Sequence, residues 1–68
     1  MNTYLFVNEN GSEYCSNIHP EWDEEYKIWH CLCEGVDGNY EDVQVKLPKG
    51  SIEKLTGKKL NYLNVITL

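Results

Sequence analysis

The residues best suited to chemistry in this chain are its three cysteines and two histidines. Cys31 and Cys33 are separated by one residue and follow His30, whereas Cys15 and His19 lie earlier. Alternate side chains on a strand share a face, so the two thiols could approach one zinc ion, with Cys15 and a histidine completing the site. Structural zinc sites usually place about two to four residues between paired cysteines, and cysteine is often simply buried. We therefore expect core cysteines and no cofactor, with a small zinc-stabilised module as the alternative.

The spacing of these residues does not indicate catalysis. A cysteine nucleophile needs a base beside its thiol, but His30 and Cys31 are neighbours that would point to opposite faces of a strand. The stretch after Asp37 has Asp42 at the position where a calcium loop has glycine. A chain of 68 residues also has little room for a deep pocket. We expect that the protein is not an enzyme.

The segment between His19 and Lys27 combines an aromatic residue with clustered negative charge. Trp22 lies there among carboxylates, where a tryptophan that only packs in a core is less expected. Tryptophan and tyrosine are preferred anchors of protein interfaces, and carboxylates steer basic partners. The alternative is that Trp22 folds back onto the domain while the acids are solvated. We predict a partner-binding site made of Glu21, Trp22, Asp23, Glu24, Glu25 and Tyr26.

Charge is distributed unevenly along the chain, whose formal net charge is −5. Residues 1–45 contain ten acidic side chains and one basic side chain, a net charge of 1 − 10 = −9. Residues 46–68 contain five lysines and one glutamate, a net charge of 5 − 1 = +4. The chain contains no arginine for bidentate base recognition, so direct nucleic-acid binding is not favoured. The favoured partner is a larger protein with a basic surface.

Length and composition limit the class of protein. Sixty-eight residues allow one domain, spanning residues 1–68, with marginal stability. No apolar run approaches the roughly 18 residues of a membrane span, and no basic and apolar leader is present, so we expect neither membrane insertion nor export. The odd number of cysteines favours a reduced, cytoplasmic setting.

The chain contains neither alanine nor arginine, a bias typical of AT-rich coding sequences. In composition it resembles small acidic accessory proteins of phages and mobile elements. That resemblance implies an inhibitor of a host or defence nucleic-acid-binding protein, whose carboxylates imitate the phosphates of nucleic acid. The alternative is a homo-oligomeric structural or accessory protein, in its simplest form a homodimer, that pairs through strand edges in residues 40–47 and 65–68.

The elements that must position these side chains are mostly strands. Residues 3–7 and 12–16 are prone to form strands around an Asn-Gly pair at residues 10–11, which favours a two-residue hairpin turn. Residues 16–25 contain a proline and many charges, and they are expected to form a loop. Residues 26–33 carry apolar side chains on both alternating faces, which predicts a central or strongly bent strand buried on both sides.

The second half of the chain contains a further hairpin and a short helix. The Asp-Gly pair at residues 37–38 predicts a turn. It precedes a strand over residues 40–47 that would bury Val43, Val45 and Leu47. Ser51 is expected to cap a helix that Gly57 ends, and residues 65–68 are a short terminal strand.

Two hairpins, a loop, a short helix and a terminal strand predict a mainly β domain, or a small α+β one. The order resembles that of the five-stranded SH3-like small barrels, on topology alone. The Ala-Leu-Tyr-Asp-Tyr signature of peptide-binding SH3 domains is absent, and His30 follows Trp29 where those domains have a second tryptophan. Binding of proline-rich peptides is therefore not implied. The alternative fold is an antiparallel meander with one short C-terminal helix packed on one face.

Overall fold

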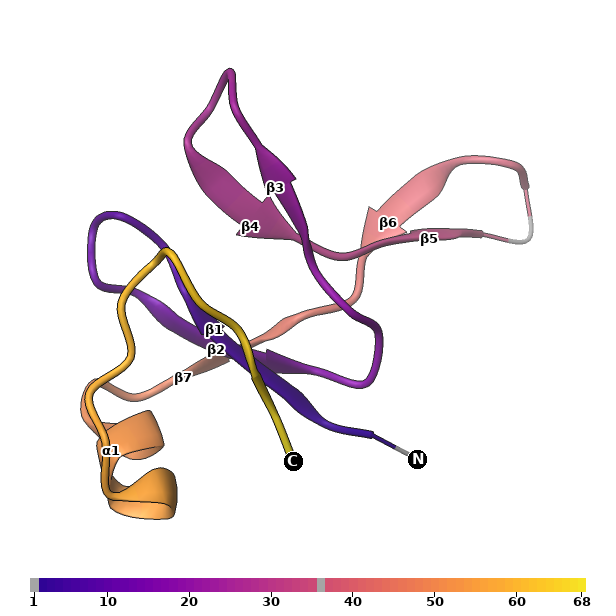
Figure 1. The fold of residues 1–68 in the computed structure, drawn as a ribbon. Helices are drawn as coiled ribbons and strands as arrows, with labels where there is room; N and C mark the ends of the chain where they lie inside the picture. Colours follow the sequence, from indigo (N-terminus) through magenta and orange to yellow (C-terminus); the bar gives the residue numbers. More distant parts are fainter. Residues whose placement is uncertain (1, 36) are drawn as a thin grey trace.

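The computed structural model describes residues 2–35 and 37–68, and it confirms the mainly β class with one short helix in this part of the chain. The elements follow one another as shown in Figure 1. In chain order they are β1 (Tyr4–Val7), β2 (Glu13–Ser16), β3 (Glu21–Asp23), β4 (Ile28–His30), β5 (Leu32–Glu34), β6 (Tyr40–Asp42), β7 (Val45–Leu47), α1 (Ser51–Thr56) and β8 (Ile66–Thr67).

The described strands form three antiparallel sheets rather than one. The largest has the order β7-β2-β1-β8, while β3 pairs with β4 and β5 pairs with β6. No closed barrel is formed by these strands, so the five-stranded SH3-like barrel is not confirmed. The physical reason is that each of the two long predicted strands pairs with two different neighbours. In residues 26–33, β4 pairs with β3 and β5 pairs with β6; in residues 40–47, β6 pairs with β5 and β7 pairs with β2. The place of β7 beside β2 also differs from a meander, in which consecutive strands are neighbours.

The core lies between the four-stranded sheet and the helix. Leu5 and Val7 of β1 are buried together with Ile52 of α1. On β1, Phe6 is also fully buried and stacks on Tyr14 of β2, with ring centroids 5.7 Å apart. Each such side chain contributes about 1.5–3 kcal/mol to the free energy of unfolding. β1 is therefore an inner strand of the sheet that is buried on both faces, and the helix packs on the sheet, as the alternative fold predicts.

The first hairpin is confirmed, but its turn is longer than predicted. Val7 pairs with Glu13, and the amide of Asn8 donates a 2.9 Å hydrogen bond to the carbonyl of Ser12. Three residues therefore form the loop, with Gly11 in the left-handed region at φ 87°. Three-residue hairpin loops commonly end on such a left-handed residue, which glycine adopts without steric cost.

Residues 16–25 were predicted to be a loop, and this is wrong for β3. The single strand predicted over residues 26–33 is also wrong, because it is divided into a turn, β4 and β5. The division falls at buried Cys31, whose amide donates to Oε1 of Gln44 at 3.2 Å and whose carbonyl accepts from the amide of Val43 at 2.9 Å. The predicted burial on both faces is also absent, since Ile28 is 37% exposed and Leu32 47%.

The predicted strand over residues 40–47 likewise divides, into β6 and β7. The second hairpin turn is confirmed, with Gly38 at φ 85° between β5 and β6. Val45 was expected in the core but is 60% exposed, because it lies on β7, an outer strand of the four-stranded sheet. The alternation of apolar residues indicated strands correctly but did not reveal that they belong to different sheets.

The helix begins and ends close to the predicted residues. Its cap position is Gly50 rather than Ser51, and no side chain of the cap residue bonds to the helix. The carboxylate of Glu13 on β2 takes that role, accepting hydrogen bonds from the amides of Gly50 at 2.5 Å and Ile52 at 2.9 Å. Gly57 ends the helix in the left-handed region at φ 75°, as expected. The terminal strand is confirmed as β8, which pairs with β1.

Candidate functional site

The hairpin formed by β3 and β4 contains the predicted partner-binding segment. Glu21 pairs with His30, and Trp22 lies directly opposite Trp29. A turn over residues 24–27 joins the strands, and Oδ1 of Asp23 accepts the amides of Glu25 at 2.9 Å and Tyr26 at 3.1 Å. A carboxylate that bonds to amides two and three residues later is a common device for closing a turn. Asp23 therefore shapes this hairpin from within.

The two tryptophans of the hairpin meet a third aromatic residue from the C-terminal segment. The rings of Trp22 and Trp29 lie edge to face, with centroids 5.3 Å apart. Trp22 also stacks on Tyr62 at 5.7 Å and an interplanar angle of 27°. The indole N–H of Trp29 donates to the carbonyl of Tyr62 at 2.7 Å, and the Trp29 amide donates to Oδ1 of Asn8 at 2.8 Å. These bonds attach the hairpin to both neighbouring segments.

An open cleft of about 500 Å³ lies between these segments, which Figure 1 shows on the same side of the molecule. This volume is within the usual range of small-ligand sites. Three aromatic rings form its walls together with one leucine, and three charged side chains lie beside them. Its residues are Glu9, Trp22, Glu24, Lys27, Trp29, Tyr62 and Leu63, and we call this site the aromatic cleft.

The charged groups of the aromatic cleft are connected through Glu24. Its carboxylate accepts the indole N–H of Trp22 at 2.7 Å and pairs with the ammonium of Lys27. The Lys27 ammonium, and after it the Trp22 indole, lowers the pKa of Glu24, while Glu24 raises the pKa of Lys27. Both groups are therefore charged at neutral pH. The bond to Glu24 also fixes the orientation of the Trp22 ring at the mouth of the cleft.

Only part of the predicted site enters this cleft. Trp22 and Glu24 line it, whereas Asp23 is half-buried in the turn. Glu21, Glu25 and Tyr26 are exposed outside it. Trp22 is itself half-buried, so it packs on its neighbours and also leaves part of its surface open to solvent.

Sequence reasoning missed the remaining cleft residues. A four-residue turn placed after Asp23 would have predicted Lys27 and Trp29 as site residues, because a strand pairing across that turn sets Trp29 opposite Trp22. No local pattern brings Tyr62 or Glu9 to this place, because they come from segments distant in the chain.

The cysteines and histidines that were candidates for zinc do not gather. Cys31 is buried and donates its thiol to the carbonyl of Ile18 at 3.3 Å, and burial raises the pKa of this thiol. Cys15 is half-buried on β2, Cys33 is exposed on β5, and Nε2 of His30 faces Asp23 at 3.8 Å. Within residues 2–35 and 37–68, no three His, Cys, Asp or Glu side chains form a group that could hold a metal ion.

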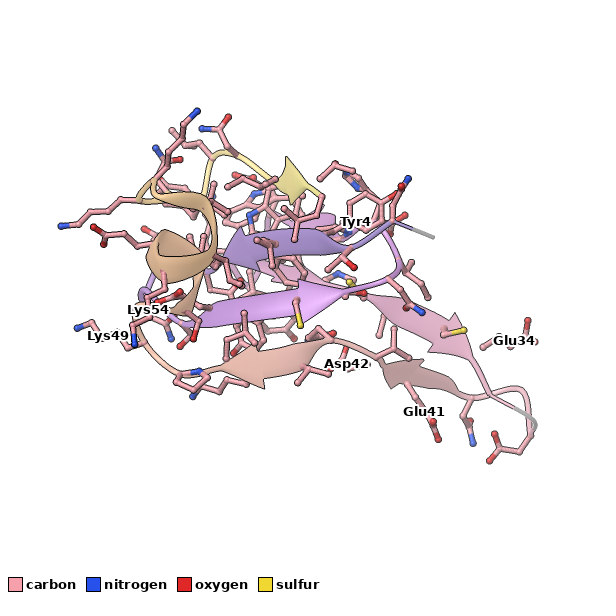
Figure 2. All side chains as sticks on the ribbon, turned by 90° about the horizontal axis from the view of Figure 1, so that it is seen from below. Tyr4, Glu34, Glu41, Asp42, Lys49 and Lys54 are labelled. Atoms are coloured by element: carbon pink, nitrogen blue, oxygen red, sulfur yellow. The ribbon has the colours of Figure 1, made fainter. Side chains whose placement is uncertain are left out.

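Negative charge is concentrated in the β3–β4 and β5–β6 hairpins. Residues 21–42 contain eight acidic side chains and one lysine, a net charge of 1 − 8 = −7. Figure 2 shows Glu34 and Glu41 at one end of the molecule, with Lys49, just before α1, and Lys54, within α1, at the other. The molecule measures 40 × 29 × 18 Å, and this charge difference runs along its length.

Comparisons with protein-family models, with curated proteins and with solved structures find no match for this chain. The function is therefore inferred from the aromatic cleft and the charge distribution themselves. In the described part of the chain, no helix has the length and apolar character needed to cross a membrane.

Proposed function

We propose that this protein is a small acidic, non-enzymatic binding module that attaches to a basic surface of a larger protein. The observation that carries the proposal is the aromatic cleft, an open site with two tryptophans beside the most acidic part of the chain. Half-buried aromatic side chains supply most of the binding energy in many interfaces. The surrounding carboxylates raise the rate at which a basic partner is encountered.

The proposed partner is a nucleic-acid-binding protein of a host or of its defence systems, inhibited by charge mimicry. Support comes from the eight carboxylates of residues 21–42, which the β3–β4 and β5–β6 hairpins carry, with Glu34 and Glu41 at one end of the molecule. A protein that binds phosphates presents lysines and arginines in a matching array. The compositional resemblance to phage and mobile-element accessory proteins supports the same class of partner and a cytoplasmic setting.

Pairing between copies of this chain is the second candidate. The observation that favours it is the place of β7 and β8 as outer strands of the four-stranded sheet. However, these strands contain only three and two residues, and β7 carries Lys46. Short edges with a charged residue are typical of sheets protected against pairing. The aromatic cleft is therefore the better-supported interface.

Substitution of Trp22 by alanine tests the proposed function. We expect the Trp22→Ala variant to bind its basic partner at least about tenfold more weakly, as is typical of a central aromatic anchor. The measurement is capture of basic proteins from a bacterial lysate, followed by titration of the purified partner and competition with double-stranded DNA. Leu55→Ala is the matched control, because Leu55 is a large apolar residue, 66% exposed, on α1.

Two results would contradict this proposal. In the first, no basic protein is recovered by the wild-type chain. In the second, Trp22→Ala strongly lowers the melting temperature and its partner affinity falls only in proportion to the unfolded fraction. Trp22 would then act as a packing residue.

A further inference from the structure

The geometry points to a specific ligand for the aromatic cleft: we propose that it accepts one alkylammonium group, the side chain of a lysine or a methylated lysine of the partner. This inference rests on the proposed function and deepens it, because it names the group that the site recognises. Trp22, Trp29 and Tyr62 supply the aromatic surface, and Glu9 and Glu24 supply the negative charge.

The walls of the cleft suit a cation attached to an apolar stem. The faces of indole and phenol rings carry negative electrostatic potential, which attracts ammonium groups, and the attraction is strongest for tryptophan. The lysine stem is apolar and packs against aromatic and aliphatic surface while its ammonium remains near water. The cleft combines both features, since Leu63 and three rings line a space that is open to solvent.

The charge balance of the cleft leaves one negative charge unmatched. Two carboxylates, Glu9 and Glu24, line it against the single ammonium of Lys27, a net charge of 1 − 2 = −1. Glu24 accepts two hydrogen bonds, whereas Glu9 accepts none from the described residues. A second cation beside Glu9 would therefore complete the charge balance without breaking a hydrogen bond.

Lys27 already supplies one ammonium group to the lining of this cleft. Its ammonium lies in the cleft against Glu24, and the nearby carboxylates of Glu24 and Glu9 raise its pKa. It is also the only non-glycine residue with positive φ, at 56°, in residues 2–35 and 37–68. This backbone conformation is uncommon for lysine. The turn thus holds one ammonium beside Glu24, and its positive charge repels a second ammonium that approaches Glu9.

The test uses small probes in place of the unidentified partner. Nα-acetyl-lysine amide, its trimethylated form and tetramethylammonium are titrated into the purified chain, with the neutral isostere Nα-acetyl-norleucine amide and the arginine analogue alongside. Tryptophan fluorescence and the NMR signals of the Trp22 and Trp29 indole N–H groups report binding. We expect saturable shifts with the three ammonium probes, with Kd on the order of millimolar.

Three variants test whether the probe binds in the aromatic cleft. Glu24→Gln should weaken binding, and Lys27→Asn should strengthen it about two- to fivefold by removing the positive charge that repels the ligand. Asparagine is chosen because it tolerates positive φ. Lys49→Asn is the comparison variant, since it removes the same charge from a residue that does not line the cleft and should leave Kd unchanged.

The proposal is overturned if the indole signals do not shift, if norleucine binds as well as lysine, or if the arginine analogue binds more tightly. Equal effects of Lys27→Asn and Lys49→Asn would also overturn it, since only overall charge would then matter. These outcomes are separable from the proposed function. If the chain does not bind the probes but loses its basic partner on Trp22→Ala, the proposed function holds and the proposed ligand is wrong. If the chain binds the probes but has no basic partner, the ligand holds and the proposed function is wrong.

Discussion

At the scale of single residues, Glu13 connects two parts of the molecule that lie far apart in the sequence. Its side chain is 9% exposed and lies on β2, yet its two oxygens accept amides at the start of α1. The first amides of a helix have no partner within the helix, and a helix of six residues is too short to be stable alone. The position of α1 therefore depends on a carboxylate 37 residues earlier.

We expect Glu13→Gln to lower the free energy of unfolding by about 1–3 kcal/mol, because the neutral amide has one acceptor oxygen where the carboxylate has two. Urea titration measures this loss. The matched control is Glu41→Gln, an exposed position on β6, where the change should stay within about 0.5 kcal/mol. Equal stability of the two variants would show that the buried carboxylate does not hold the helix.

At the scale of the elements, the sequence alone predicted correctly those turns and helix ends that local interactions determine. Asp37 and Gly38 predicted a turn, Gly57 predicted the end of the helix, and each is found there. Prediction failed in two places. Pro20 and the charges after it favoured a loop, but Trp22 pairs with Trp29 across the turn that Asp23 closes, and this pairing makes β3 a strand. Likewise, the break at Cys31 depends on Gln44, which no local pattern connects to it.

The same contrast applies to the candidate site. Trp22 and Glu24 were predicted, because an aromatic residue among carboxylates is visible in the sequence. Tyr62 and Glu9 were not, because their place beside Trp22 exists only after the chain has folded.

The loop between β1 and β2 allows a test of turn geometry at this scale. Gly11 has φ 87°, and a Cβ atom placed there would meet no atom within 4 Å. Any loss of stability must therefore come from the backbone conformation. We expect Gly11→Ala to cost about 1–2 kcal/mol and Gly11→Asn distinctly less, because asparagine adopts left-handed conformations more readily. Thermal unfolding measures both variants, and equal losses would contradict the assignment.

At the scale of the whole molecule, the charge difference between the two ends predicts how a partner is approached. Glu34 and Glu41 lie far along the acidic end, where they would steer a basic partner before contact. We expect the double variant Glu34→Gln/Glu41→Gln to slow association about two- to fivefold at low salt and to leave dissociation unchanged. Stopped-flow or surface-based kinetics at two ionic strengths separates the two rates.

The control for this experiment is the pair Lys49→Gln/Lys54→Gln at the other end. It changes the net charge by the same amount in the opposite direction, and we expect it to change association little. If it accelerates association as much as the glutamate pair slows it, then total charge rather than its location governs the encounter.

The change of partner between β6 and β7 has a consequence for local stability. The side chains of β5 are all exposed, so the hydrogen bonds that join it to β6 lie close to water, unlike those that β1 makes in the core. Opening of such a unit costs less free energy than unfolding of the whole chain. We therefore expect the β5–β6 hairpin to open more readily than the core, and a partner that contacts it to hold it closed.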